Sequence, residues 1–374
     1  MQGLTAPVKR VNRWRRVAVI KRASAQLLVR RALAFVQNVR WRNPIVPRLR
    51  VTSAVRQSGT AWFITPDWNR PSGGICKQYR SVDVLNAAGI SAAIVHHSKG
   101  FRCDWFYNET RVVAAHEVEV SPSDVIVVPE IYKGSMCALP SGVRQVILNQ
   151  NVYVTLDSLA SGAPNAASPY LNNPNLVAVA VVSDQNAELL HYAFRDLLIH
   201  RIRWALDPTV YFPPPLLPER RIAFMPRRRA HEAAQVIALL RLRGVLDEWE
   251  IIEIIGRKEL EVAEIMRSCR LFLSFSEREG LGLPPLEAIA CGCLVVGFTG
   301  HAGAEYFQRP FATSVDDGDI GRFAAEAERI LTWTEADPGT AWQAALAGSQ
   351  YATSTYSPDA ERCDLVGLFQ PLLP

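Results

Sequence analysis

The fold is decided by the stretch Ser274–Gly297, which reads SFSEREGLGLPPLEAIACGCLVVG. The apolar run at 271–276 predicts a buried strand, and the two prolines after it are tolerated in the first turn of a helix at 284–291. Gly292 stands where a glycine commonly ends a helix, and 294–298 is a second apolar, β-branched run. The stretch therefore predicts a strand, a loop, a helix and a further strand.

Two carboxylates stand at the points of this unit where a ligand would bind. Glu279 lies at the tip of the first strand, and Glu287 lies in the first turn of the helix, whose N-terminus favours an anion. Gly280 and Gly282 lie between them, and glycines let a ligand approach the backbone closely. Each glutamate also has a plain structural explanation. Glu287 would stabilise the dipole of its own helix, and Glu279 would be a solvated loop residue.

Similar strands and helices are predicted along the whole chain after the first 60 residues or so. Apolar strands that alternate with helices favour parallel sheets covered on both faces. In the first half the predicted strands are 61–65, 91–97, 124–129, 144–148 and 176–182, with a helix at 75–88 after a turn at Gly73-Gly74. In the second half they are 221–225, 249–255, 271–276 and 294–298, with helices at 231–242, 260–269, 284–291 and 319–333. Residues 341–373 are predicted to be helical in parts.

Residues 207–218 contain five prolines and cannot form an ordinary helix. We interpret this segment as a linker between the two halves of the chain. The predicted α/β chain has five parts. They are a basic N-terminal extension (1–57), an N-terminal Rossmann-like domain on the acceptor side (58–207), the linker (208–219), a C-terminal Rossmann-like domain on the donor side (220–350) and a C-terminal helical segment that packs back on the N-terminal domain (351–374).

The spacing of the two glutamates resembles the donor-site motif of retaining glycosyltransferases of the family 4 type. These have the GT-B fold, in which two Rossmann-like domains face each other across a cleft. The motif is E-G-x-G-L-P-x-x-E-A-x-A-x-G. The residues that match it here are Glu279, Gly280, Gly282, Leu283, Pro284, Glu287, Ala288, Ala290 and Gly292. The resemblance extends over 221–331 and is weaker in the N-terminal half.

The resemblance implies a role for each carboxylate. Glu287 would accept hydrogen bonds from the two ribose hydroxyls of the nucleotide, and Glu279 would contact the donor sugar near the reacting carbon. The leaving diphosphate needs positive charge, which Arg227 and Arg228 would supply after the strand at 221–225. The spaced lysine of the family is absent here, and a solvated charge run is the alternative for these arginines.

Three loops complete the expected donor site. Gly73-Gly74 stands where the family has a glycine-rich loop against the donor phosphates and acceptor, and backbone amides near Gly303 could hold a phosphate. Asn149-Gln150-Asn151 either faces the ligands or forms a capped turn. The residues expected to line the donor beside Glu287 are Gly280, Leu281, Gly282 and Leu283.

The implied enzyme is a hexosyl- or deoxyhexosyltransferase. It would move a sugar from a nucleoside-diphosphate sugar to a hydroxyl of a glycan or lipid-linked acceptor, with retention and without a metal or other cofactor, in synthesis of cell-envelope polysaccharide or glycoconjugate. Alternatives of the same fold are a sugar-nucleotide epimerase and a sugar phosphorylase, and one of another class is a non-catalytic sugar-nucleotide- or glycan-binding subunit. A dinucleotide oxidoreductase is disfavoured, because Gly73-Gly74 lacks the G-x-G-x-x-G spacing. The acidic cluster 316–319 favours a helix cap over a metal site.

Charge is distributed unevenly along the chain. The net charge is +5, but 14 of the 41 basic residues and none of the 36 acidic residues precede Asp67. Basic residues interleaved with Trp14 and aliphatic side chains favour an anionic membrane surface over nucleic acid as the partner of residues 1–57, and a poorly ordered extension is the alternative.

No apolar run reaches the roughly 18 residues of a spanning helix. The seven cysteines follow no zinc pattern and fit a reducing compartment, so the expected location is the cytoplasm, including the inner face of the membrane.

Overall fold

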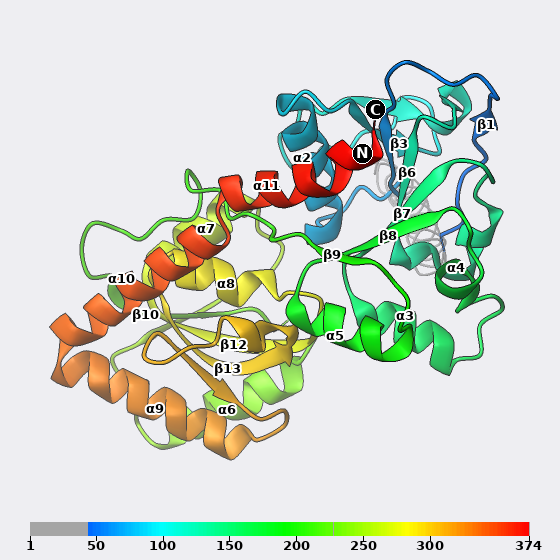
Figure 1. The fold of residues 1–374 in the computed structure, drawn as a ribbon. Coiled ribbons are helices and arrows are strands. Elements are labelled where there is room, and N and C mark those ends of the chain that lie inside the picture. The colour runs from blue at the N-terminus through cyan, green and yellow to red at the C-terminus, as the bar shows by residue number, and fades with distance from the viewer. Residues whose placement is uncertain (1–43, 227, 374) are drawn as a thin grey trace, which may run out of the picture. The chain divides into compact units, whose positions relative to one another are not determined.

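The computed structural model describes residues 44–226 and 228–373, which contain two large parallel sheets with helices packed on them (Figure 1). The first has seven strands in the order β4-β3-β2-β6-β7-β8-β9. Three of its strands are buried over their whole length, as expected for apolar strands covered on both faces. The strands are β2 (Ala61–Ile64), β3 (Ala92–His96), β4 (Val112–Ala114), β6 (Val125–Pro129), β7 (Arg144–Asn149), β8 (Leu176–Val181) and β9 (Ile199–Arg201).

The second sheet has five parallel strands in the order β11-β10-β12-β13-β14. They are β10 (Glu219–Phe224), β11 (Glu250–Glu253), β12 (Cys269–Glu279), β13 (Leu294–His301) and β14 (Ala312–Val315). The main helices of the chain are α2 (Gly73–Ala87), α3 (Val152–Ala160), α5 (Asp184–Ala193), α6 (Ala230–Leu242), α7 (Glu259–Arg267), α8 (Leu283–Ala290), α9 (Ile320–Ala336), α10 (Pro338–Thr355) and α11 (Pro358–Phe369). The α/β class and the paired parallel sheets predicted from the sequence are confirmed.

The strand order of each sheet reverses at one point. The reversal lies between β2 and β6 in the first sheet and between β10 and β12 in the second. Ligands of open parallel sheets bind outside the carboxyl ends of the strands at such a reversal. Gly73, Glu130 and Arg228 follow β2, β6 and β10, and Glu279 is the last residue of β12, so the fold concentrates these residues at both reversals.

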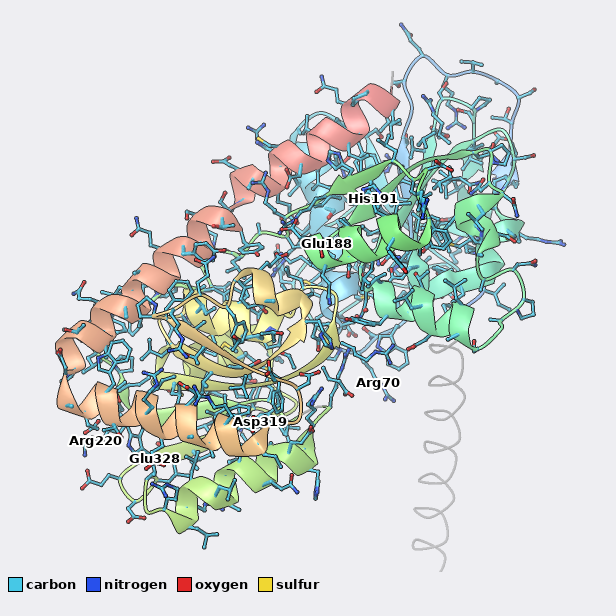
Figure 2. All side chains as sticks on the ribbon, turned by 60° about the horizontal axis from the view of Figure 1, so that its bottom comes forward. Arg70, Glu188, His191, Arg220, Asp319 and Glu328 are labelled. Carbon is cyan, nitrogen blue, oxygen red and sulfur yellow. The ribbon has the colours of Figure 1, made fainter. Side chains whose placement is uncertain are left out.

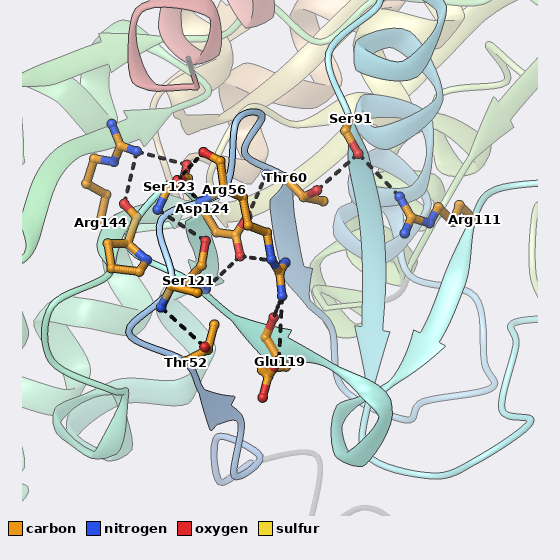
Figure 3. A network of polar contacts seen from close by, with 12 residues as sticks. Thr52, Arg56, Thr60, Ser91, Arg111, Glu119, Ser121, Ser123, Asp124 and Arg144 are labelled. Carbon is orange, nitrogen blue, oxygen red and sulfur yellow. Dashed lines mark hydrogen bonds and ion pairs between the residues drawn. The ribbon is translucent and has the colours of Figure 1, made fainter.

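Residues 45–57 belong to the first domain, so the predicted extension at 1–57 is too long. Val46 is buried in the core of the first sheet, and β1 (Arg50–Val51) pairs with β5 (Glu119–Val120). Arg56 donates to the carbonyl of Glu119 at 2.7 Å and lies 3.4 Å from the buried carboxylate of Asp124 (Figure 3). The compact unit therefore begins at Ile45, and residues 1–43 lie outside the described part of the chain.

The helix predicted at 75–88 begins earlier than expected. Gly73 and Gly74 are its first two residues and do not form a separate turn. The strands β4, β9 and β14 were not predicted because they are only three or four residues long, and α3 was not predicted because it mixes β-branched with polar residues. Helix α5, which begins with three polar residues, was also missed.

The C-terminal helices return the chain to the first sheet. Asp319, labelled in Figure 2, lies at the start of α9. Its side chain accepts a hydrogen bond from the amide of Arg322 at 2.8 Å, which confirms the predicted helix cap. Helix α11 packs on α2. On α11, Asp364 accepts two hydrogen bonds, at 2.8 and 2.7 Å, from the guanidinium of Arg203 just after β9. None of the helices in 44–226 and 228–373 is both long and apolar enough to cross a bilayer.

Candidate functional site

Glu279 is the last residue of β12 and pairs with His301 of β13. The register with β13 shifts between Ser276 and Glu279, so the strand has a bulge just before Glu279. Gly282 then adopts a left-handed φ of 82° immediately before α8, a conformation that favours glycine. At the other end, Gly292 follows α8 with a φ of 83°, as expected for a C-terminal glycine. The local backbone thus places Glu279 and the N-terminus of α8 on one loop.

The carboxylate of Glu279 is paired with one of the three arginines after β10. Arg228 Nη1 lies 3.4 Å from Glu279 Oε1 and also donates to the carbonyl of Glu277. Arg229 points elsewhere, since its guanidinium pairs with Glu232 and Asp317 and lies 4.8 Å from the ring centroid of Phe298. The prediction for Arg227 falls outside the described residues.

The carboxylate of Glu287 lies in a separate polar network. The hydroxyl of Tyr211 donates to Glu259 Oε1 at 3.3 Å and lies beside the carboxylate of Glu287. Glu259, at the start of α7, binds Arg80 of α2 through both of its oxygens at 2.9 Å. Burial, together with the charge of Glu259, raises the pKa of Glu287 to about 7. Glu287 therefore titrates near neutral pH.

Gln150 lies against one glycine from each domain, Gly74 and Gly280. A Cβ on Gly280 would fall 1.7 Å from the carbonyl oxygen of Gln150, and one on Gly74 would fall 2.0 Å from its side-chain oxygen. A Cβ on Gly73 would lie 3.1 Å from Leu283. Glycine is therefore required at position 280 for this approach of the β7–α3 loop to the end of β12, whereas at position 74 the Gln150 side chain could move aside.

Asn151 forms the capped turn considered for the cluster 149–151 and also contacts the end of β12. Its side-chain oxygen accepts from the amide of Tyr153 at 3.0 Å and so caps α3. Its side-chain nitrogen donates to the carbonyl of Arg278 at 2.9 Å. Asn149 is buried and donates to Thr155 and Tyr170, so it belongs to the core.

Two predicted donor-loop residues, Leu281 and Gly303, are buried. The side chain of Leu281 is buried at 2% exposure and cannot face a ligand. Gly303 is also buried, and a Cβ there would lie 2.8 Å from the hydroxyl of Tyr306. That hydroxyl donates to the carbonyl of Gly282, so Tyr306 fixes the loop before α8.

Comparison with known proteins identifies the class of this chain. Residues 243–337, which include both glutamates, match the family described as glycosyl transferases group 1. A protein named alpha-1,6-glucosyltransferase from Actinobacillus pleuropneumoniae is 28% identical over 279 residues, which cover 70% of this chain and 78% of that protein. The chain is a glycosyltransferase.

Solved structures show which fold the glycosyltransferase has. A sucrose-phosphate synthase from Thermosynechococcus elongatus aligns with a TM-score of 0.65 at 14% identity, over 84% of this chain and 99% of that one. A glycosyltransferase from Rickettsia africae gives 0.61 at 12% identity, over 85% and 99%. HepE from Anabaena, solved with UDP-glucose, gives 0.60 at 13% identity, over 83% and 99%. These likenesses, with the two parallel sheets, establish the GT-B fold.

The glycosyltransferase contains two carboxylates near the site that sequence reasoning missed. Glu130, which follows β6, is buried and accepts from the backbone amides of Gln150 and Asn151 at 3.0 and 3.1 Å. Burial raises its pKa to about 7. Glu305 pairs with Arg201 at 2.6 Å and accepts from the hydroxyl of Tyr356. Neither residue stands beside its partners in the sequence, so no local motif identifies it. Glu130 could still have been proposed as a site residue, because it directly follows a predicted strand.

No group of three His, Cys, Asp or Glu side chains in the described ranges is arranged to hold a metal ion. The acidic residues 316–319 are used otherwise, because Asp319 caps α9 and Asp317 pairs with Arg229.

Proposed function

We propose that this glycosyltransferase moves a sugar from a nucleoside-diphosphate sugar to a hydroxyl of a glycan or lipid-linked acceptor, with retention of configuration. The observation that carries the proposal is the placement of Arg228 against Glu279 at the reversal point of the second sheet. The bond between the anomeric carbon and the diphosphate breaks, a bond to the acceptor oxygen forms, and the acceptor proton leaves with the diphosphate or solvent.

The charges of the site suit this reaction. The transition state has oxocarbenium character, and the departing diphosphate gains negative charge. A carboxylate beside the sugar and a guanidinium beside the diphosphate stabilise opposite ends of that charge separation. Arg228 and Glu279 pair with each other at 3.4 Å. Donor binding would insert the reacting bond between their two charges.

The proposed nucleotide site is the surroundings of Glu287. An ionised carboxylate can accept hydrogen bonds from two vicinal ribose hydroxyls, each a charge-assisted bond. UDP-glucose is the first donor to test, because the relative from Actinobacillus is named a glucosyltransferase and HepE was solved with that sugar nucleotide. We propose that Arg228, Arg227 and backbone amides supply the charge for the leaving group without a metal.

A direct assay tests the proposal. The protein is incubated with UDP-, GDP- and ADP-sugars, with and without candidate oligosaccharide acceptors, and release of nucleoside diphosphate is measured in the presence and absence of EDTA. We expect acceptor-dependent release that survives EDTA. Donor conversion without acceptor would support an epimerase, release that depends on inorganic phosphate would support a phosphorylase, and binding without turnover would support a binding subunit. Abolition by EDTA and restoration by Mg²⁺ or Mn²⁺ would contradict metal independence.

We further propose that residues 1–44 bring the enzyme to an anionic membrane surface on the cytoplasmic side. The proposal rests on sequence alone, since 11 of the 14 basic residues before Asp67 precede Ile45. Such a location would suit a lipid-linked acceptor.

A further inference from the structure

The peptide unit that joins Arg278 to Glu279 is held from the other domain. Its carbonyl oxygen, that of Arg278, accepts a 2.9 Å hydrogen bond from Nδ2 of Asn151. Because a peptide unit is planar, fixing this oxygen also fixes the direction in which the chain enters Glu279. Arg228 approaches the same carbonyl at 3.5 Å from the side of β10.

Arg278 has a backbone conformation that needs such support. Its φ is 48°, in the left-handed region that a non-glycine residue enters at a cost. Its side chain lies on α3, with the guanidinium carbon 4.8 Å from the ring centroid of Tyr153 and an ion pair to Asp157. Both members of that ion pair are exposed, so it contributes little by itself. The hydrogen bond from Asn151 is the more specific constraint.

Asn151 is itself held rigidly. Its side-chain oxygen caps α3 by accepting from the amide of Tyr153, and its backbone amide donates to the buried carboxylate of Glu130. The same carboxylate binds the amide of Gln150, whose carbonyl oxygen lies against Gly280. A chain of contacts thus runs from a buried acid of the first domain to the residue before Glu279.

We propose that Asn151 is a positioning residue for the reaction, which orients Glu279 toward the donor sugar only while the two domains are in contact through the 149–151 loop. The inference rests on the proposed role of Glu279. It adds that the acceptor-side domain supplies part of the geometry of the donor site, so that turnover depends on contact between the domains.

The test is Asn151→Asp, which removes the Nδ2 donor but keeps an oxygen that caps α3 equally well. We expect kcat to fall about 10- to 100-fold, while the dissociation constant of the nucleoside diphosphate stays within about threefold of wild type. The matched control is Asn173→Asp. Asn173 also donates and accepts through its amide, to Gln145 and from Asn175, but it precedes β8 at the opposite end of the sheet. We expect wild-type kcat from the control.

A double variant separates positioning from general structure. If Asn151 acts only through Glu279, then Asn151→Asp combined with Glu279→Gln loses no more activity than Glu279→Gln alone. Multiplication of the two losses, or wild-type kcat in Asn151→Asp, would overturn the inference. Wild-type turnover in Glu279→Gln would instead overturn the role proposed for Glu279. If Asn151→Asp does not fold, Asn151→Ser provides the same test, because serine also caps the helix and is too short to reach the carbonyl.

Discussion

Arg228 on the loop after β10 and Glu279 at the end of β12 form an ion pair of 3.4 Å between neighbouring strands at the reversal of the second sheet. Both side chains are partly exposed, at 37% and 25%, so a ligand can reach them. The pair is a poor source of stability at that exposure. We therefore expect the Arg228–Glu279 pair to serve catalysis, not stability.

If Arg228 stabilises the leaving diphosphate as proposed, Arg228→Ala should lower kcat about 100-fold, because one preorganised charge is lost. Arg228→Lys should recover only part of the loss, since an ammonium lacks the planar fork of a guanidinium. Steady-state kinetics with saturating acceptor measure both variants. Arg221→Ala is the matched control, because Arg221 lies at the amino end of the same strand and pairs with Glu250. Equal kcat values in Arg228→Ala and the control would contradict the assignment.

The two motif glutamates should separate kinetically. If Glu279 acts on the reacting sugar as proposed, Glu279→Gln should reduce kcat far more than nucleotide affinity. Glu287→Ala should weaken binding of the nucleoside diphosphate by about 2 kcal/mol, as expected for loss of a charged hydrogen-bond acceptor. Calorimetry with nucleoside diphosphate, beside kinetics, separates the two effects. If the affinity of Glu287→Ala is unchanged in a folded protein, the ribose site lies elsewhere.

The elements that sequence reasoning recovered are those whose signal is local. The strand predicted at 124–129 is β6, and the helix predicted at 284–291 is α8, because apolar runs, prolines and a terminal glycine act within a few residues. Helix α3 was missed because VYVTLDSLA mixes β-branched and polar residues and is stabilised by its cap and by packing.

Only part of the candidate site could be predicted from the sequence, again because only local patterns are visible there. Glu279 and Glu287 stand in one contiguous motif, so their spacing identifies them. The contacts of Asn151 with Arg278 and of Arg80 with Glu259 join residues of different domains. They depend on how the domains meet, which no local pattern specifies. The boundary at residue 57 was placed too late for a related reason, because β1 is two residues long and its partner β5 is distant in sequence.

The raised pKa of Glu287 predicts a dependence of donor binding on pH. If the ionised carboxylate binds ribose, nucleotide affinity should fall below pH 7 and be roughly tenfold weaker at pH 6 than at pH 8. The folded protein holds this proton more tightly than the unfolded chain. The contribution of Glu287 to the free energy of unfolding is therefore fully present below its unfolded pKa of 4.5 and is lost as pH rises through about 7.

Glu287→Gln tests both consequences. The variant should bind nucleotide weakly with a flatter pH profile, and its Tm relative to wild type should be higher at pH 8 than at pH 5. Glu264→Gln, an exposed carboxylate of α7, is the control and should shift neither profile. If Glu287→Gln keeps the wild-type pH profile, another group governs the pH dependence of nucleotide binding. The charged and titratable groups around the carboxylate are Cys76, Lys77, Arg80, Tyr211, Glu259, Cys291 and Tyr306.

A chain that starts at Ile45 should stay folded and active on a soluble acceptor, but should no longer sediment with anionic vesicles. Each basic residue near an anionic leaflet contributes about 1 kcal/mol, so the full chain should bind phosphatidylserine vesicles and be released by high salt. Phosphatidylcholine vesicles are the control. A chain that starts at Gln57 should be destabilised, because it loses Val46, β1 and the partner of buried Asp124. Vesicle binding that survives removal of 1–44 would place the membrane surface on the folded part.

The close approach of Gly280 to Gln150 gives a steric test of the contact between the domains. In Gly280→Ala the new Cβ would lie 1.7 Å from a backbone oxygen, so the 149–151 loop and the end of β12 must separate. We expect kcat/KM to fall about 100-fold, since reacting groups on the two domains are no longer held together. Gly74→Ala should cost less, because its Cβ meets only the end of the Gln150 side chain, which can rotate away. Gly321→Ala on α9, where the new Cβ would lie an ordinary 3.7 Å from Asp319 Oδ1, is the matched control and should have wild-type activity. Near wild-type kcat/KM in Gly280→Ala, with an unchanged Tm, would mean that catalysis does not use this approach of the loops.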